Sequence, residues 1–259
     1  MFDGYLARWD LLADGDPIAT RSARLLPVRR GDRPAMLKIA IAAEERAGSE
    51  LMIWWGGIGA AAVLAHDGDA VLLERGGGSL LGQDDDTASR IACATLDLLQ
   101  RPRAGHPPPL VPLDVWCRAI RTAEGGALAD SAAAWTTLLA APRDVCVLHG
   151  DAHHGNILDF GPRGWLAIDP KGLIGERGFD YANLLCNPDH PGVTDQARFA
   201  RQVAVISAAA RLEPRRLMQW ALAYAGLSAA WFIADGMADR AATPMTVARI
   251  AAQALGTGG

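Results

Sequence analysis

The sequence predicts an α+β protein of two lobes, a β-rich lobe over residues 1–75 and a mainly helical lobe over residues 76–259. Short apolar runs separated by turn-forming residues continue as far as residue 74, which is typical of an antiparallel sheet. Three glycines at 76–78 then end this pattern, and helical periodicity dominates the rest of the chain. With 259 residues, half of them hydrophobic, the chain is long enough to bury a sizeable core.

The predicted N-terminal sheet contains a charged residue within an apolar strand. Short strands are expected between residues 5 and 40, and the run 35–40 places Lys38 among apolar neighbours. A lysine there is costly unless it contacts an anion, although a lysine on the solvent face of a sheet needs no such partner. A helix is expected over residues 44–55, and residues 60–74 have the pattern of a hairpin.

The C-terminal lobe is expected to be built from helices around one central segment. Acidic residues at 84–86 favour a helix start, because the exposed N–H groups of a helix N-terminus attract negative charge. This helix is expected to reach residue 99, and a rigid, proline-rich connection follows over residues 101–112. Further helices are predicted over residues 113–123, 127–140, 180–185, 195–211, 214–235 and 244–255.

The central segment, residues 147–170, combines short strands with polar residues at their ends. Its apolar runs have the length of strands, are separated by turn-forming residues, and cover 145–148, 157–158 and 165–168. Asp151, Asn156 and Asp169 are therefore expected in loops and at strand ends.

The spacing of these three polar residues suits the transfer of a phosphoryl group. Such a transfer needs a carboxylate near the incoming hydroxyl and oxygen ligands that hold Mg²⁺ against the nucleotide phosphates. Kinase catalytic loops supply that carboxylate and, five positions later, an asparagine for the metal, while an aspartate after a later strand completes the metal site. Asp151 and Asn156 have this interval, and Asp169 follows the third apolar run.

Other interpretations of the segment remain open from the residues alone. His149, His153 and His154 suggest a zinc cluster, because imidazoles four residues apart share one face of a helix. However, Gly150, Gly155 and the flanking strands disfavour a helix at this place. Two further interpretations are that the segment is a hairpin with incidental carboxylates, or that it belongs to a kinase-like fold that binds nucleotide without turnover.

The central segment resembles the aminoglycoside phosphotransferase family, whose catalytic loop has the pattern His-Gly-Asp-x-His-x-x-Asn. Every fixed position of that pattern is present: His149, Gly150, Asp151, His153 and Asn156. Residues 168–183 are similar to the streptomycin 6-kinase branch, the aminoglycoside/hydroxyurea antibiotic resistance kinases, and the resemblance spans nearly the whole chain. One departure is the absence of a GxGxxG motif before Lys38, so residues 22–30 are expected to cover the phosphates through backbone contacts.

The resemblance implies a protein-kinase-like fold and ATP-dependent phosphorylation of a hydroxyl on an aminoglycoside, giving antibiotic resistance. Streptomycin at its 6-hydroxyl is the expected acceptor, ATP the co-substrate and Mg²⁺ the cofactor. Another small alcohol, an amine sugar or a hydroxyurea-like compound remains an alternative acceptor, because the motif reports the chemistry and not the acceptor. A non-catalytic nucleotide-binding protein is the alternative of another class, but it would have no chemical need for the full set of catalytic residues.

The resemblance also assigns roles in catalysis. Asp151 would accept the hydroxyl proton, while Asn156 and Asp169 would hold Mg²⁺. The residues expected to support the catalytic loop are His149, His153 and Asp180. Lys171, two positions after Asp169, has no assigned role and would either weaken metal binding or help to neutralise phosphate.

Nucleotide binding would involve both ends of the N-terminal lobe. Lys38 would position the phosphates, and Glu45 on the following helix would be its carboxylate partner. Two nearby glutamates remain alternatives to Glu45, namely Glu44 and Glu50. The hinge that hydrogen-bonds adenine is expected at the backbone of Glu74 and Gly76.

The acceptor contacts are predicted from a helix near the C-terminus. Trp231 and Asp235 are four residues apart and share a helix face. An aromatic ring beside a carboxylate suits a polycationic sugar, and Glu176 and Asp189 are further candidates. A tryptophan in the core and an aspartate at a helix end would explain the same pair without a ligand.

Composition excludes several other classes of protein. A net charge of −4 without a basic cluster argues against nucleic-acid binding, and four scattered cysteines without a CxxC pair argue against a zinc ribbon or a redox motif. The first ten residues lack the pattern of a signal peptide, so a cytoplasmic protein is expected. Residues 217–234 are free of charge over the length of a membrane span, but polar residues interrupt them, so a buried helix is expected. No membrane contact or obligate protein partner is predicted.

Overall fold

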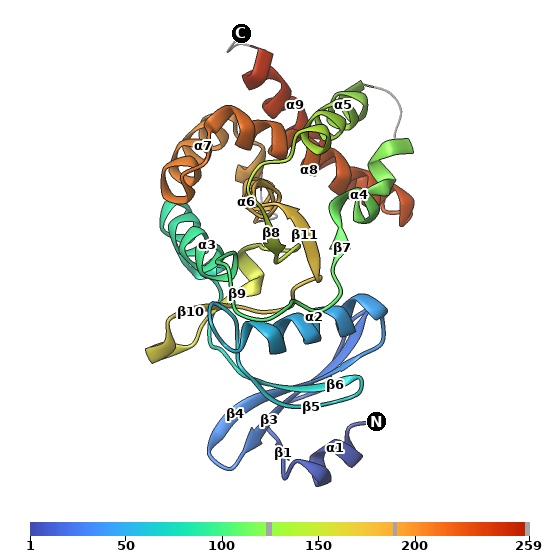
Figure 1. The fold of residues 1–259 in the computed structure, drawn as a ribbon, viewed down its shortest axis with the longest axis vertical. Coiled ribbons are helices and arrows are strands. Elements are labelled where there is room, and N and C mark those ends of the chain that lie inside the picture. The colour runs from blue at the N-terminus through green and yellow to red at the C-terminus, as the bar shows by residue number, and fades with distance from the viewer. Residues whose placement is uncertain (123–125, 189–190, 257–259) are drawn as a thin grey trace.

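The computed structural model describes residues 1–122, 126–188 and 191–256, and it has the two-lobed α+β architecture predicted from the sequence. The N-terminal lobe contains a sheet and lies below the helical C-terminal lobe in Figure 1, with helix α2 (Ala43–Trp55) between them. The sheet ends at Glu74, and we place the boundary between the lobes in the glycine-rich connection that follows.

The N-terminal sheet is antiparallel, with the strand order β1-β3-β4-β6-β5, and β2 also pairs with β3. The strands are β1 (Leu12–Ala13), β2 (Ile18–Ala19), β3 (Ala23–Arg30), β4 (Arg33–Ala40), β5 (Val63–Asp67) and β6 (Ala70–Glu74). Gly31 and Gly68 lie in the two hairpin turns with φ of 57° and 58°, a conformation that is costly for residues with a Cβ atom.

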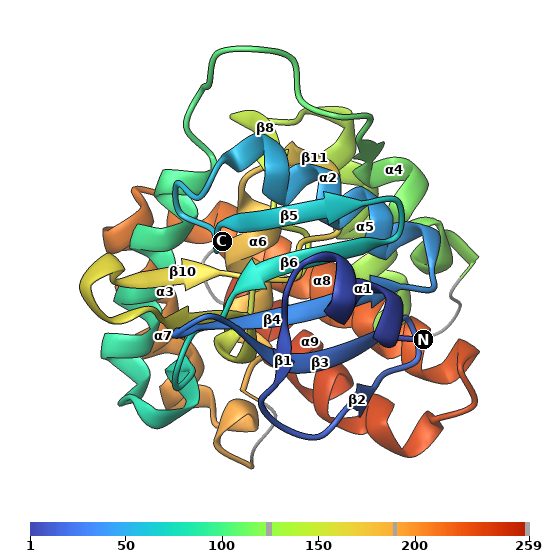
Figure 2. The ribbon, with the colours of Figure 1, turned by 90° about the horizontal axis from the view of Figure 1, so that it is seen from below.

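The two faces of this sheet are covered by different helices. Helix α1 (Asp3–Arg8) lies on the face away from the C-terminal lobe, in front of the sheet in Figure 2. The prediction of strands from residue 5 onward was wrong here, because Phe2, Tyr5, Leu6 and Trp9 have helical spacing and pack together on the sheet. On the opposite face, α2 packs its apolar side into a core shared with the C-terminal lobe.

The C-terminal lobe is mainly helical, as predicted. Its α-helices are α3 (Asp85–Leu99), α4 (Leu113–Trp116), α5 (Gly126–Ala140), α6 (Gly178–Leu185), α7 (Gln196–Ala210), α8 (Pro214–Ala234) and α9 (Ala242–Gly256). Asp84 caps α3 by accepting a hydrogen bond from the backbone N–H of Thr87 at 3.0 Å. Shorter 3₁₀ turns connect these elements: Leu80–Gly82, Arg118–Thr122, His154–Asn156, Gly161–Arg163, Pro191–Thr194 and Ala238–Ala241.

Helix α8 forms the centre of this lobe. Among the described residues it is the one helix whose length and composition would allow it to cross a membrane, but 61% of its apolar window is buried inside the protein. It packs against α5, α6 and α9, and its side chains Trp220 and Leu227 are fully buried. These contacts agree with the predicted buried helix.

Two small sheets lie where the lobes meet. Strands β7 (Val111–Pro112) and β8 (Val145–Leu148) pair with the two edges of β11 (Leu173–Glu176). Strands β9 (Ile157–Asp159) and β10 (Trp165–Ala167) form the predicted hairpin. The loops of these sheets carry the polar residues that the sequence singles out.

Candidate active site

Strand pairing brings the polar residues of the central segment together. Leu148 at the end of β8 lies opposite Leu173 at the start of β11, so the loops beyond them leave the same end of the sheet. The backbone N–H of Lys171 donates to the carbonyl of His149 at 2.8 Å and ties these loops to each other. Asp151 and Asp169 are therefore held in adjacent loops.

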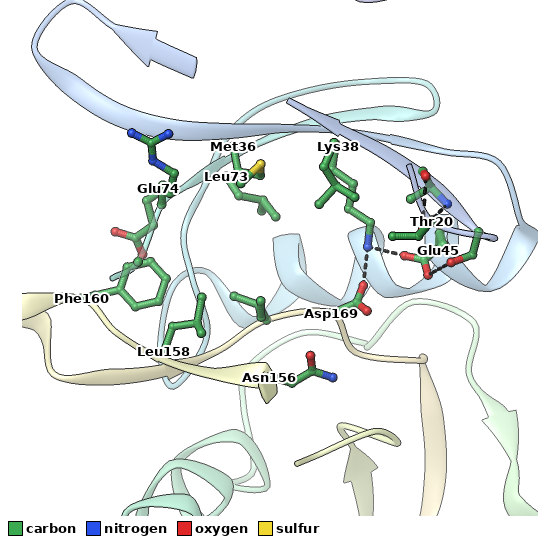
Figure 3. Close-up of a pocket in the computed structure, with 16 residues that line it drawn as sticks. Thr20, Met36, Lys38, Glu45, Leu73, Glu74, Asn156, Leu158, Phe160 and Asp169 are labelled. Carbon is green, nitrogen blue, oxygen red and sulfur yellow. Dashed lines mark hydrogen bonds and ion pairs between the residues drawn. The ribbon is translucent and has the colours of Figure 1, made fainter. Parts of the chain in front are cut away.

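The β9–β10 hairpin adds Asn156 to the same site. Its last antiparallel pair is Ile157 with Ala167, and the N–H of Ile168 donates to the carbonyl of Asn156 at 2.9 Å. Asn156 and Asp169 therefore lie next to each other at the end of the hairpin, and both line the space between the lobes (Figure 3).

Lys38 spans this space from the N-terminal lobe. It lies on β4, its residue is 8% exposed, and its ammonium forms ion pairs with Glu45 of α2 and Asp169 (Figure 3). Glu45 is buried and also accepts a hydrogen bond from the hydroxyl of Ser22 at 2.8 Å. Of the three glutamates considered from the sequence, the structure brings Glu45 to Lys38.

A glycine allows α2 to approach this ion-paired cluster. A Cβ atom on Gly48 would lie 2.1 Å from the carbonyl oxygen of Pro170, well inside contact distance. The absence of that atom lets α2 pack directly on the turn after Asp169 and keeps Glu45, one helical turn earlier, against Lys38.

A cavity of about 270 Å³ opens between the lobes beside Lys38, and we call it the interlobe cavity. Its polar end is formed by Lys38, Glu45, Asn156 and Asp169. Apolar side chains from both lobes form its walls: Leu25, Met36, Leu73, Leu158, Phe160 and Ile168. An apolar slot that ends at a lysine and three oxygen-bearing side chains fits a planar base with phosphates attached.

The predicted hinge lies at the other end of the interlobe cavity. The carboxylate of Glu74 accepts from the N–H of Ala62 at 2.6 Å and pairs with Arg163, so the Glu74 side chain is engaged within the protein. A Cβ atom on Gly76 would lie 2.8 Å from the ring of Phe160. Because glycine lacks this atom, the chain can pass close to the cavity wall here. Glu74, Arg75 and Gly76 all line the interlobe cavity, and the adenine contacts predicted there stay a prediction.

Asn156 and Asp169 form an oxygen-rich pair that suits Mg²⁺. The Nδ2 group of Asn156 donates to the carbonyl of Asp151 at 2.9 Å, which leaves its amide oxygen to the cavity (Figure 3). Burial raises the pKa of Asp169, but Lys38 and Lys171 outweigh this effect and hold the pKa well below its usual value. The Asp169 backbone has a φ of 62°, a strained conformation that turns its carboxylate toward the cavity. An ionised carboxylate beside an amide oxygen is typical of Mg²⁺ binding.

The histidines do not form the zinc cluster that the sequence left open. His149 is buried; its Nε2–H donates to the carbonyl of Ile168 at 2.9 Å, and its Nδ1 accepts from the N–H of Asp151 at 3.2 Å. The Nδ1 of His153 accepts from the N–H of Gly155 at 3.0 Å. Across the described ranges, no group of three or more His, Cys, Asp or Glu side chains is arranged to hold a metal.

Asp151 lies at the base of a second space. Its carboxylate accepts from Nδ2 of Asn183 at 3.4 Å, and it lies 3.9 Å from Lys171 Nζ and 4.0 Å from His153 Nε2. Burial raises the pKa of Asp151, while His153 and Lys171 act in the opposite direction. Its carboxylate is therefore half-buried, with 32% of the side chain exposed, and it lines an accessible space without a tight ion pair.

Asp180 holds the backbone of the catalytic loop. It is fully buried on α6 and accepts hydrogen bonds from the N–H groups of His149 at 2.9 Å and Gly150 at 2.8 Å. Nε2 of Gln100 also donates to it at 3.1 Å. These hydrogen bonds hold the backbone of the loop that leads to Asp151. Asp180 therefore lies where the sequence predicted a residue that supports the catalytic loop.

The second space is a cavity of about 340 Å³ inside the C-terminal lobe, which we call the C-lobe cavity. Asp151 and His153 form one wall, and the remaining walls come from α6 and the residues just after it, from α8, and from the 3₁₀ turn Ala238–Ala241 with the start of α9. The residues that line it there are Asn183, Cys186, Asn187, Tyr224, Ser228, Phe232, Arg240, Thr243 and Pro244. Amides, hydroxyls and aromatic rings thus surround Asp151, which suits a ligand rich in hydroxyls.

The structure does not bring the residues predicted as acceptor contacts to this cavity. Trp231 packs edge-on against Trp116 with ring centroids 6.3 Å apart, and Asp235 forms an exposed ion pair with Arg21 at 2.7 Å. Asp189 lies outside the described residues. The cavity instead receives Tyr224, Ser228 and Phe232, which share the neighbouring face of α8 at intervals of four residues.

Glu176 is also placed away from the cavity, and its carboxylate is fully engaged. Both oxygens accept from the guanidinium of Arg216, at 2.9 Å and 2.6 Å, and Nε1 of Trp220 and the N–H of Arg143 complete its hydrogen bonds. Arg216, the second of two adjacent arginines at the start of an otherwise apolar helix, was the sequence signal that could have indicated a buried carboxylate partner.

Comparison with known proteins agrees with the motif and the fold. Residues 8–236 match the family model for the aminoglycoside/hydroxyurea antibiotic resistance kinases. The chain is 50% identical to a streptomycin 3''-kinase of Klebsiella pneumoniae, over 89% of this chain and 92% of that protein. It is 31% identical to a streptomycin 6-kinase of Streptomyces griseus, over 95% of this chain and 86% of that protein.

A solved structure shares the fold. It is a thermostable mutant of aminoglycoside phosphotransferase APH(4)-Ia in a ternary complex with ADP and hygromycin B, with a TM-score of 0.67 and 13% identity over 96% of this chain and 97% of that one. This structure agrees with the fold, and the family model and sequence matches confirm the resemblance given by the catalytic loop. The chain therefore belongs to the aminoglycoside/hydroxyurea antibiotic resistance kinase family and is a phosphotransferase.

Proposed function

We propose that this protein transfers the γ-phosphoryl group of ATP to a hydroxyl group of streptomycin. The observation that carries this proposal is the junction of the two cavities at the catalytic loop. Asn156 and Asp169 line the interlobe cavity, Asp151 lines the C-lobe cavity, and Asn156 donates to the backbone of Asp151 at 2.9 Å. A nucleotide in one cavity and an alcohol in the other would meet at these residues.

Each residue has a separate task in this reaction. Lys38, held by Glu45, would bind the nucleotide phosphates at the polar end of the interlobe cavity. Asp151 would orient the acceptor hydroxyl and take its proton, and burial of its carboxylate increases its affinity for that proton. Asn156 and Asp169 would hold Mg²⁺, which supplies positive charge to the phosphates. The hydrogen bonds from the loop backbone to Asp180 keep Asp151 in position during the transfer.

The acceptor is proposed from the sequence matches together with the lining of the C-lobe cavity. Asn183, Asn187 and Ser228 offer hydrogen bonds to sugar hydroxyls, and Phe232 offers an apolar ring face. The motif at residues 168–183 favoured the 6-hydroxyl of streptomycin, but the 50% identical relative is a 3''-kinase. We therefore propose the 3''-hydroxyl as the site of transfer.

The test is a coupled assay of ADP release with streptomycin, hygromycin B, kanamycin and hydroxyurea as separate acceptors. We expect Mg²⁺-dependent turnover of streptomycin, and an NMR spectrum of the product that places phosphate on the 3''-oxygen. Phosphate on the 6-oxygen would restore the first prediction from the motif. Turnover of another compound in preference to streptomycin would overturn the proposed acceptor, and the absence of any turnover by a protein that binds ATP would overturn the proposed reaction.

A further inference from the structure

Lys171 lies among three carboxylates that come from three different parts of the chain. Its ammonium is 3.4 Å from Asp169 Oδ2, 3.5 Å from Glu45 Oε1 and 3.9 Å from Asp151 Oδ2. The side chain is 14% exposed, and its loop is tied to the catalytic loop through the backbone of His149. Lys171 is therefore placed between the predicted proton acceptor and the predicted metal ligand.

The contacts of Lys171 differ from those of Lys38. Lys38 is in close contact with Glu45 and Asp169, whereas each carboxylate oxygen near Lys171 lies well beyond the roughly 2.8 Å of a tight charge-assisted hydrogen bond. Three carboxylates nevertheless surround the Lys171 ammonium, so its positive charge is balanced although its side chain is only 14% exposed. Lys171 thus remains charged while it is held only loosely.

We propose that Lys171 is a catalytic residue that binds the γ-phosphate of ATP and stays with this phosphoryl group during its transfer. This proposal rests on the proposed function, because it requires ATP in the interlobe cavity and an alcohol at Asp151. In the transfer, the bond from the γ-phosphorus to the β,γ-bridging oxygen breaks and a bond to the acceptor oxygen forms. The hydroxyl proton goes to Asp151, and ADP is the leaving group.

The position of Lys171 matches that path. Asp169 lines the interlobe cavity and Asp151 lines the C-lobe cavity, and the Lys171 ammonium lies 3.4 Å from the first carboxylate and 3.9 Å from the second, within reach of both ends of the transfer. Lys38 contacts Asp169 and Glu45 but is not paired with Asp151 within the described part of the chain, so it suits phosphates that do not move. The sequence left two roles open for Lys171, weakening of metal binding or neutralisation of phosphate, and this geometry favours neutralisation of phosphate.

The competing explanation is that Lys171 only holds the three carboxylates together. In that case its removal would disturb the interlobe cavity in the same way for every nucleotide. A direct contact with the γ-phosphate instead affects ATP but not ADP, because ADP lacks this group. The ratio of the two affinities separates these explanations.

The experiment measures the Kd of ATP and of ADP by calorimetry, with and without Mg²⁺, for the wild type and three variants. For Lys171→Met we expect ATP binding to weaken by about tenfold or more, since a charged hydrogen bond to phosphate is lost, while ADP binding changes less than about twofold. Lys171→Arg should recover most of the ATP affinity, because it restores the positive charge. Lys38→Met is the matched control, and it should weaken both nucleotides.

Steady-state kinetics and thermal unfolding complete the test. The kcat of Lys171→Met should fall by about 100-fold or more, with a KM for the acceptor close to that of the wild type. Equal losses for ATP and ADP, or an unchanged ATP affinity, would overturn the role of Lys171. If Lys171→Met does not fold, Lys171→Gln provides the same ratio. A wild-type protein that binds neither nucleotide would instead overturn the proposed function.

Discussion

The interlobe cavity and the C-lobe cavity differ in how their polar groups are held. At the interlobe cavity, Lys38, Glu45 and Asp169 form a buried network of ion pairs that connects both lobes. The C-lobe cavity is lined mainly by amides, hydroxyls and aromatic rings, with Asp151 as the carboxylate and Arg240 as the guanidinium among its described lining residues. The interlobe cavity therefore suits a charged ligand such as a nucleotide, and the C-lobe cavity suits a ligand with many hydroxyl groups.

This difference shows where chemistry and acceptor choice are encoded. The groups for phosphoryl transfer come mostly from one continuous segment, because two short strand pairs return the chain to the same site. The groups around the acceptor come from three different helices, α6, α8 and α9, and from the residues next to them, so their arrangement depends on how those helices pack. Relatives that share the chemistry can therefore differ in the hydroxyl they act on, as the names of the streptomycin 3''-kinase and the streptomycin 6-kinase illustrate.

The largest effect is expected at Asp151, the carboxylate that lines the C-lobe cavity next to the interlobe cavity. Asp151→Asn should lower kcat by about 10²–10⁴, because the carboxylate that accepts the hydroxyl proton is replaced by a neutral amide. The Kd of ATP should stay within about twofold of the wild type, since Asp151 lines the C-lobe cavity and not the interlobe cavity. The measurement is ADP release together with calorimetry of ATP binding, and a near-normal kcat would remove Asp151 from catalysis.

The sequence was sufficient to predict the parts of the site that follow from local spacing. The interval between Asp151 and Asn156, and the hairpin that leads to Asp169, require these residues to lie near one another. The acceptor side was not predictable in this way, because Trp231 and Phe232 differ by one position and face different neighbours. Only the packing of α8 against α6 and α9 decides that Phe232 faces the cavity while Trp231 packs on Trp116.

Close backbone approaches were also beyond the sequence. Gly48 looks like an ordinary helix glycine, and its contact with Pro170 depends on how the two lobes meet. Helix α1 was missed for a related reason, since the helical spacing of its apolar residues extends over a helix of only 6 residues, which is too short to distinguish from the strand pattern that follows.

The loop shared by both cavities should carry a pH-dependent stability. Burial lowers the pKa of His149 from 6.5 to about 4. Above pH 6.5 the ring is neutral in both states and contributes nothing to the pH dependence. Between pH 6.5 and 4 the unfolded chain binds a proton that the folded protein does not, so stability falls as the pH falls. The total loss attributable to His149 is about 3 kcal/mol below pH 4, because a pKa that is lower by one in the folded protein corresponds to about 1.4 kcal/mol.

The measurement is urea unfolding of the wild type and of His149→Asn at several pH values between 4 and 7. The wild type should lose stability relative to the variant as the pH decreases. Burial raises the pKa of Asp180 to about 6, which has the opposite sign because the folded protein then binds the extra proton. Asp180 is present in both proteins, so its contribution cancels in the difference. Parallel curves would show that the folded protein accommodates a charged His149.

A substitution at Gly48 should damage the interlobe cavity selectively. Gly48→Ala places a Cβ atom 2.1 Å from the Pro170 carbonyl, so α2 must shift away from the turn and carry Glu45 with it. The expected cost is about 1–3 kcal/mol of unfolding free energy, with weaker ATP binding and an unchanged KM for the acceptor. Gly4→Ala in α1 is the matched control, because its Cβ atom would meet nothing within 4 Å. Equal behaviour of the two variants would show that α2 packs less tightly on Pro170.

The smallest effect tests which face of α8 borders the acceptor. Phe232→Ala should raise the KM for streptomycin by about tenfold with little change in ATP binding, because a ring face in the C-lobe cavity is lost. Asp235→Ala should change the KM by less than about twofold, since this carboxylate forms an exposed ion pair with Arg21, and such pairs contribute little.

Trp231→Ala is the control for loss of an aromatic ring on the same helix. Its ring packs on Trp116, so the variant should be less stable to heat while its KM for the acceptor stays close to that of the wild type. The contrast therefore lies between Phe232, which changes KM, and Trp231, which changes stability. If Asp235→Ala or Trp231→Ala raised the KM more than Phe232→Ala did, the acceptor would bind on the side of α8 that faces Arg21 and Trp116, and the C-lobe cavity would lose its assignment as the acceptor site.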